Sequence, residues 1–253
     1  MFTCVCSCKF VPLYDLVKKR SLLSTIVTLM NKVQLAVHAL CKMLGGFGLL
    51  LLLLFLPAGT WHYWHAWLFI MLLFVPMTCM GVWMLIASPK LLVKRLNNKE
   101  KEQVQKHVVT LSSLMFVGGF VVCGLDHRFA WSNMPHWMII SSGVIFLIGY
   151  AMYAEVLREN AYLSRTIEVQ GDHQLVDSGL YGVIRHPMYT ASLLMFLSMP
   201  IVLGSWWALL IFMVYPILIV VRIKNEEKVL VAQLEGYVDY QIRVRWRLIP
   251  LVW

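Results

Sequence analysis

The feature that most limits the possible folds of this chain is a series of long apolar segments that contain almost no charge. Six can be placed, at about 36–56, 64–87, 109–125, 137–156, 188–203 and 205–221. A helix needs about 20 apolar residues to cross the hydrocarbon core of a bilayer. Charged residues make up only 14% of the chain, against about 25% in soluble domains. The sequence therefore predicts an all-α, polytopic membrane protein with about five to six transmembrane helices.

The fifth and sixth segments are shorter than the first, second and fourth. Sixteen residues of helix rise about 24 Å, which is less than the roughly 30 Å thickness of the hydrocarbon core. Pro200 and Gly204 lie near the junction of the two segments. We therefore expect a tight C-terminal helical hairpin that is either re-entrant or crosses a locally thinned bilayer.

The formal net charge is +9, and the positions of the basic residues predict the topology. The loop between the second and third segments holds six Lys or Arg residues, whereas the loop 126–136 holds only Arg128. The region after about residue 157 is again rich in Arg and Lys. The positive-inside rule then places both termini and the C-terminal region in the cytoplasm. Nucleic acid is not an expected partner, because no basic patch is interleaved with stacking aromatic residues.

The N-terminal residues form neither a signal peptide nor a span. Three consecutive basic residues, Lys18 to Arg20, precede a short stretch of mixed polarity. We expect residues 1–35 to be an N-terminal extension, of which 1–29 are dispensable, since Met30 begins a segment that runs directly into the first span. Within that span, Gly45, Gly46 and Gly48 are expected to allow close helix packing.

The cysteine and histidine residues do not predict a metal centre. Cys4, Cys6 and Cys8 are crowded near the N-terminus, but no second cluster completes a four-ligand site. Free thiols in a reducing compartment are the expected state. The closeness of His62 and His65 leaves a membrane metal-dependent oxidase or desaturase as an alternative. Such enzymes need several His clusters on one face, and the other histidines of this chain are scattered.

Three polar blocks remain outside the apolar segments, and they are the candidates for chemistry. They lie within residues 159–182, 181–189 and 222–247. The hairpin should return the second and third blocks to the same membrane face. Arg222 and Glu226 are four residues apart, so they share one face of a continuous helix.

Each of these residues also has an ordinary explanation when it is taken alone. Arg185 next to a span is typical of a positive-inside anchor. Pro187 suits the first turn of a helix, and Arg222 with Glu226 suits a surface ion pair. The occurrence of all of them in one order, at one membrane face, favours a functional site.

The order of the blocks resembles the membrane methyltransferase superfamily that includes isoprenylcysteine carboxyl methyltransferases and phospholipid methyltransferases. Upstream, residues 56–61 and 126–132 are similar to bacterial members, so the resemblance covers nearly everything from Met30 onward and suggests a bacterial inner membrane. The motifs that carry the resemblance are His173-Gln174-Leu175-Val176, Gly179-Leu180-Tyr181, Arg185-His186-Pro187-Met188-Tyr189, Arg222 with Glu226-Glu227-Lys228-Val229-Leu230, Gly236-Tyr237, Tyr240 and Pro250.

The resemblance implies an S-adenosylmethionine-dependent methyltransferase. Its cytoplasmic cofactor pocket and catalytic region would lie in residues 157–253, after a four-helix membrane region at 36–156. The resemblance directs Arg222 toward the acceptor and makes Glu226 and Glu227 the other catalytic candidates. The implied cofactor contacts are His173, Gln174, Leu175, Val176, Tyr181, Arg185, His186, Pro187, Met188, Tyr189 and Glu226.

These residue types suit the cofactor chemically. A methyl sulfonium is a cation, so aromatic faces and carboxylates are suitable neighbours for it. The carboxylate of the cofactor can accept charge-assisted hydrogen bonds from Arg or His. The chain departs from the family pattern at Gly182, where members often have Arg, and at Ala191, where Gly is common. The first departure removes a cation from the neighbourhood of the cofactor.

The sequence leaves the methyl acceptor open between several amphiphiles from the bilayer. A carboxylate, as in isoprenylcysteine, is already ionised and needs positioning by a group such as Arg222. A phospholipid amine or a small thiol would need a base, for which Glu226, Glu227 and His186 are candidates. A non-enzymatic membrane scaffold is the remaining alternative.

Overall fold

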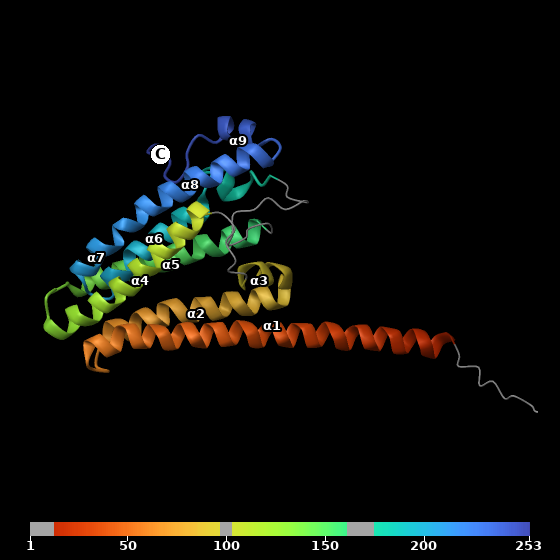
Figure 1. The fold of residues 1–253 in the computed structure, drawn as a ribbon, viewed down its shortest axis with the longest axis horizontal. Coiled ribbons are helices and arrows are strands. Elements are labelled where there is room, and N and C mark those ends of the chain that lie inside the picture. The colour runs from red at the N-terminus through yellow and green to blue at the C-terminus, as the bar shows by residue number, and fades with distance from the viewer. Residues whose placement is uncertain (1–12, 97–102, 161–174) are drawn as a thin grey trace, which may run out of the picture.

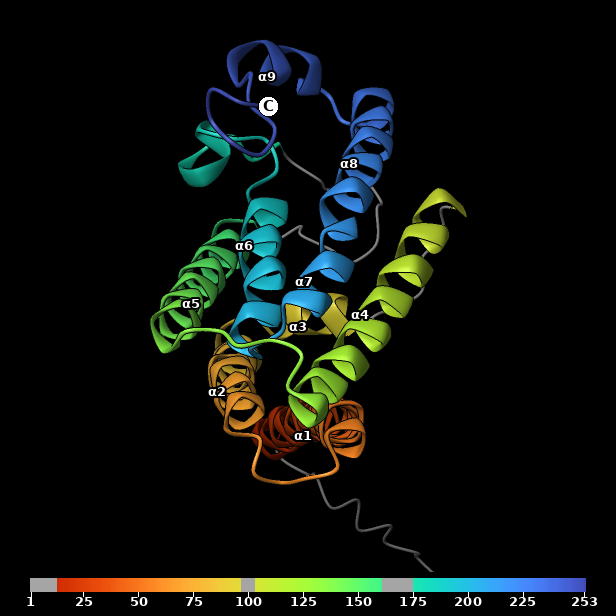
Figure 2. The ribbon, with the colours of Figure 1, turned by 90° about the vertical axis from the view of Figure 1, so that its left-hand side faces the viewer.

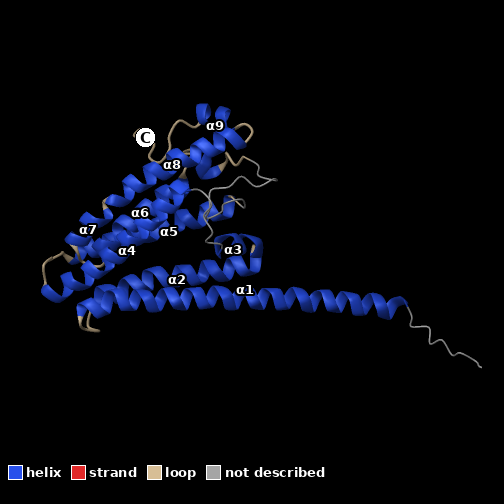
Figure 3. Cartoon of the chain, in the orientation of Figure 1, coloured by secondary structure: helices blue, strands red, loops and turns tan. Residues whose placement is uncertain are grey.

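The protein is predominantly helical in the part of the chain that its computed structural model describes, which comprises residues 13–96, 103–160 and 175–253. No strand occurs in these ranges (Figure 3), which confirms the predicted all-α class. The helices in chain order are α1 (Leu13–Ala58), α2 (Trp64–Ala87), α3 (Pro89–Leu96), α4 (Gln103–Phe129), α5 (His136–Glu159), the short 3-10 helix η1 (Gly179–Gly182), α6 (Pro187–Val202), α7 (Trp206–Phe212), α8 (Val214–Gln233) and α9 (Tyr237–Arg243).

Five helical stretches in the described residues are long and apolar enough to cross a membrane. They are Lys32–Ala58, Trp64–Ala87, Gln105–Phe129, His136–Glu159 and Trp206–Gln233, the last of which combines α7 and α8. Many of their apolar side chains point outward; Leu56 and Ile86, for example, are 71% and 72% exposed. Exposed side chains of this kind fit a hydrocarbon environment, and the predicted number of spans is confirmed.

The expectation of two short C-terminal segments is wrong for the second of them. The helical span that begins at Trp206 continues for 28 residues to Gln233, well past the end of the apolar run at residue 221. Hydropathy falls at Arg222, but the backbone hydrogen bonds of a helix do not depend on side-chain polarity, so the helix continues. Of the two C-terminal segments, only the first, which forms the 16-residue helix α6, is short.

The helices form one bundle (Figures 1 and 2). In both views α1 and α2 run together along one side, and α1 also packs against α4. Helices α4 to α8 form the rest of the bundle, and α3 lies beside the end of α2. The N-terminal part of α1 extends past the end of α2 (Figure 1). The helix is continuous from Leu13 to Ala58, so no backbone break separates residues 13–35 from the first span. Whether that segment is dispensable stays a prediction.

Close helix packing occurs at Gly149 of α5, where α6 crosses it. A Cβ at this position would lie 3.0 Å from the carbonyl oxygen of Ala191, so only glycine allows this approach. Gly45, Gly46 and Gly48 have nothing within 4 Å of an added Cβ. The expectation for these three glycines is therefore wrong, because a glycine run alone does not reveal which face of a helix has a partner.

A buried carboxylate joins three segments at the end of the bundle opposite α9. Asp126 at the end of α4 accepts hydrogen bonds from the backbone N–H and the hydroxyl of Ser132, both at 2.7 Å, and from the hydroxyl of Ser205. Ser205 in turn caps the N-terminus of α7 by accepting from the N–H of Ala208. The end of α4, the following loop and the α6–α7 turn are thus held by one side chain.

We expect Asp126→Ala to lower stability, because it leaves the donors of Ser132 and Ser205 without their acceptor. The free energy of unfolding should fall by about 2–3 kcal/mol. This corresponds to a fall in Tm of roughly 5 °C or more for a chain of this size. Thermal unfolding of the detergent-solubilised protein measures this effect. Ser141→Ala, at an exposed position of α5, is the matched control and should leave Tm unchanged.

Candidate active site

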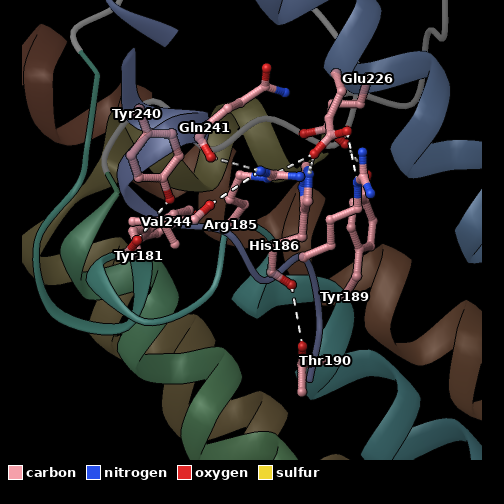
Figure 4. Close-up of polar contacts among 11 residues, drawn as sticks. Tyr181, Arg185, His186, Tyr189, Thr190, Glu226, Tyr240, Gln241 and Val244 are labelled. Atoms are coloured by element: carbon pink, nitrogen blue, oxygen red, sulfur yellow. Dashed lines mark hydrogen bonds and ion pairs between the residues drawn. The ribbon is translucent and has the colours of Figure 1, made fainter. Parts of the chain in front are cut away.

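The candidate site lies where α6 begins and the polar part of α8 runs beside it, next to η1 and α9 (Figure 4). Pro187 is the first residue of α6, where its missing N–H needs no partner. The carbonyl of His186 accepts from the N–H groups of Tyr189 and Thr190 and so starts the helix. This local geometry directs His186 and Tyr189 toward α8 (Figure 4).

Glu227 on α8 is the centre of a buried charged network. Its Oε1 lies 2.9 Å from Nε of Arg185 and 3.3 Å from Nε2 of His186, and its Oε2 accepts from Nε of Arg247 at 2.9 Å. The side chains of Glu227 and Arg185 are only 9% and 6% exposed. A carboxylate that is buried in this way is stable only because its cationic and hydrogen-bonding neighbours compensate for the loss of water.

Arg185 connects this network to the C-terminal segment. Its Nη1 donates to the carbonyls of Val244 at 3.1 Å and Gln241 at 3.3 Å. The backbone N–H groups of Arg185 and His186 donate to the carbonyls of Trp246 and Arg247, both at 2.9 Å. The Arg-His-Pro motif is therefore held in place from both α8 and the segment that follows α9.

A second set of contacts involves Tyr189, Arg222 and Glu226. The hydroxyl of Tyr189 donates to Oε2 of Glu226 and accepts from Nε of Arg222 at 2.8 Å. The Arg222 guanidinium also lies 5.9 Å from the centre of the Tyr189 ring. The sequence predicted that Arg222 and Glu226 share a helix face, and the Tyr189 hydroxyl connects the two side chains. Unlike Glu227, both are only partly buried.

Tyr181 of η1 forms a further buried polar group nearby. Its hydroxyl accepts from Nδ2 of Asn160 at 3.1 Å, and its carbonyl accepts from the hydroxyl of Tyr240 at 2.7 Å. Burial raises the pKa of Tyr181 to about 12. The hydroxyl is therefore neutral at physiological pH and remains available as a hydrogen-bond donor.

Of the other predicted cofactor contacts, three have described surroundings and two lie outside the described residues. Leu175 packs against the buried cluster of Tyr237, Tyr240 and Val244, and Val176 is partly buried. The sulfur of Met188 lies 3.8 Å from Nη2 of Arg95 on α3. His173 and Gln174 lie outside the described residues.

The sequence assigned no site role to several residues that the structure brings to this end of the bundle. The polar blocks contain three of them, Asn160, Tyr240 and Arg247. No sequence motif indicates which residues these side chains contact. Arg95 looked like one of several basic loop residues that set the topology. Its contact with Met188 joins residues 93 positions apart, and no local pattern predicts such a pair.

Comparison with known families now bears on these residues. The family model described as phospholipid methyltransferase matches the chain from the start of α5 to the turn after α8. The match covers residues 137–235. The match confirms the resemblance to the isoprenylcysteine and phospholipid methyltransferase superfamily. No curated protein gives a significant match to the chain.

The matched segment contains Arg185, His186, Tyr189, Arg222, Glu226 and Glu227, while Arg95, Tyr240 and Arg247 lie outside it. Together with the five candidate spans, the match indicates a membrane methyltransferase. Among the described residues, no group of three or more His, Cys, Asp or Glu side chains is arranged to hold a metal ion.

Proposed function

We propose that the protein transfers a methyl group from S-adenosylmethionine to an amphiphile that reaches the site from the bilayer. The observation that carries the proposal is the hydrogen-bonded set of Tyr189, Arg222 and Glu226 inside the matched family segment. It combines an aromatic face, a carboxylate and a guanidinium at one end of the bundle.

The residues at this site fit the chemistry of the cofactor. The sulfonium cation suits the Glu226 carboxylate and the Tyr189 ring, and the neutral Tyr181 hydroxyl can bind a polar group of the cofactor. When bound, S-adenosylmethionine supplies an electrophilic methyl group. The proposed cofactor contacts are Leu175, Val176, Tyr181, His186, Pro187, Met188, Tyr189 and Glu226, with His173 and Gln174 from the resemblance.

We assign Arg185 and Glu227 a different role from the one that the resemblance implied. Both are buried and already paired with protein groups: Glu227 forms contacts with Arg185, His186 and Arg247, and Arg185 also donates from Nη1 to two backbone carbonyls. We propose that they are positioning residues that hold His186 and the start of α6.

Arg222 and Glu226 would act on the acceptor in distinct ways. If the acceptor is a lipid-linked carboxylate, as in isoprenylcysteine, Arg222 holds the anion with its planar guanidinium. If the acceptor is a phospholipid amine, Glu226 can receive the proton that the amine must lose before it becomes nucleophilic. The description of the matched family favours the second class, and a small thiol would need the same base.

Binding and transfer assays on the protein in detergent test this proposal. Calorimetry should detect S-adenosylmethionine binding, and labelled methyl groups should appear on farnesylcysteine or on phosphatidylethanolamine, whichever is the true acceptor. Folded protein that does not bind S-adenosylmethionine would defeat the proposal and favour a membrane scaffold. We further propose that the site faces the cytoplasm, because the loops at this end carry most of the Lys and Arg residues.

A further inference from the structure

The guanidinium of Arg95 adjoins the candidate site, and the contacts that it makes with described residues are to a thioether sulfur and an aromatic ring. Nη1 and Nη2 lie 3.9 and 3.8 Å from the sulfur of Met188, and the group lies 5.6 Å from the centre of the Tyr153 ring. Its Nε is buried and has no hydrogen-bond partner. Thioether sulfur is a weak acceptor, so these contacts do not replace the water that a cation loses on burial.

Arg95 is held in this position from several sides. It lies near the end of α3, whose Leu91 and Leu92 are buried against Met84 of α2 and Leu157 of α5. Nζ of Lys42 on α1 donates to the carbonyl of Leu96, the last residue of α3, at 2.5 Å. α3 is a short helix that directly follows α2. The end of a membrane span is expected to lie at the depth of the lipid head groups.

The charge of Arg95 acts on the same group as the charge of Glu226. Burial is the main cause of the raised pKa of Tyr181; the Glu226 charge adds to the rise and the Arg95 charge opposes it. Met188, which contacts Arg95, directly precedes Tyr189, which contacts Glu226. A cation without a carboxylate partner among the described residues thus lies beside the proposed reaction centre.

We propose that Arg95 is an anion-binding residue for the phosphate of a phospholipid acceptor. The planar guanidinium matches phosphate oxygens and forms paired hydrogen bonds with them. In an ethanolamine phospholipid two carbons separate the phosphodiester from the amine, so a phosphate at Arg95 directs the amine toward Tyr189 and Glu226. The inference rests on the proposed methyltransferase function and specifies its substrate class.

Binding of a phosphate amphiphile tests this proposal without requiring turnover. Dodecyl phosphate is titrated by calorimetry into the protein in maltoside micelles, with dodecanoate as the carboxylate counterpart. Arg95→Gln should weaken dodecyl phosphate binding about tenfold or more, while the affinity for S-adenosylmethionine stays unchanged. Arg95→Lys keeps the charge without the planar fork and should give an intermediate affinity. Arg158→Gln, at the exposed end of α5, is the matched control and should bind as the wild type.

Three outcomes would overturn the assignment. Equal dodecyl phosphate affinity in wild type and Arg95→Gln would remove Arg95 as an anion site. Loss of S-adenosylmethionine affinity alone would assign Arg95 to the carboxylate of the cofactor. Dodecanoate binding as tight as dodecyl phosphate binding, and equally lost in Arg95→Gln, would replace the phosphate by a carboxylate. If the wild type fails to bind S-adenosylmethionine, the proposed function fails separately, and the dodecyl phosphate titration still tests Arg95.

Discussion

Glu226→Ala is expected to abolish methyl transfer and to weaken S-adenosylmethionine binding about a hundredfold. The substitution removes the carboxylate that accepts from the Tyr189 hydroxyl and that is proposed to face the sulfonium. Hydrogen bonds to charged groups contribute about 1.5–3 kcal/mol, and each 1.4 kcal/mol is a factor of ten in affinity. Calorimetry measures the loss of affinity, and a labelled-methyl assay measures the loss of rate.

Two further variants test whether the loss is specific to Glu226 and to cofactor binding. Glu235→Ala removes an exposed carboxylate just beyond α8, so it should bind the cofactor as the wild type does. Arg222→Ala should retain cofactor affinity and raise KM for the acceptor, since its guanidinium is assigned to the acceptor side. Wild-type affinity and rate in Glu226→Ala would remove Glu226 from the site.

Glu227→Ala is expected to destabilise the protein strongly. The change leaves Arg185, which is almost fully buried, next to His186 and Arg247 with no carboxylate among them. Removing one partner of a buried ion pair costs about 3–5 kcal/mol. For a chain of this length we expect Tm to fall by roughly 10 °C, as measured by thermal unfolding in detergent.

The contrast between the two neighbouring glutamates separates a positioning role from a chemical one. Glu226→Ala should lower Tm less than Glu227→Ala does, because Glu226 is only partly buried and the Tyr189 hydroxyl keeps its hydrogen bond with Arg222. Arg247→Ala should lower the free energy of unfolding less than Glu227→Ala does. The Arg247 side chain is 33% exposed, and Glu227 keeps its ion pair with Arg185 in this variant. A Tm for Glu227→Ala close to that of the wild type would contradict the positioning role. Normal stability with lost transfer would return Glu227 to the catalytic residues.

The sequence was most informative where a local property decides the structure. Apolar runs placed all five long spans, because the length needed to cross a bilayer can be counted along the chain. The same reasoning marked where the apolar run of the last span ends, at residue 221, but not where its helix ends. Hydropathy reports where the apolar environment stops, whereas the helix continues to Gln233 because its backbone bonds are internal.

The sequence predicted which residues form the candidate site better than it predicted how they are arranged. The motif order indicated that the Arg-His-Pro block and the Arg222–Glu227 block meet, and the contacts of His186 with Glu227 and of Tyr189 with Glu226 confirm this. Which of the two glutamates is buried among cations was not predictable. Adjacent residues on a helix point about 100° apart, so only the packing of α6 and the C-terminal segment decides their environments.

The sequence by itself therefore determined the membrane class, the spans and the family, because hydropathy and motif order are properties of short stretches of chain. The tertiary structure alone decided the roles that depend on distant partners. The positioning role proposed for Glu227 rests on its contacts with Arg185, His186 and Arg247, the histidine being 41 residues away. The site role proposed for Arg95 rests on the contact between α3 and Met188. Such contacts follow from the packing of whole helices, which no local pattern encodes.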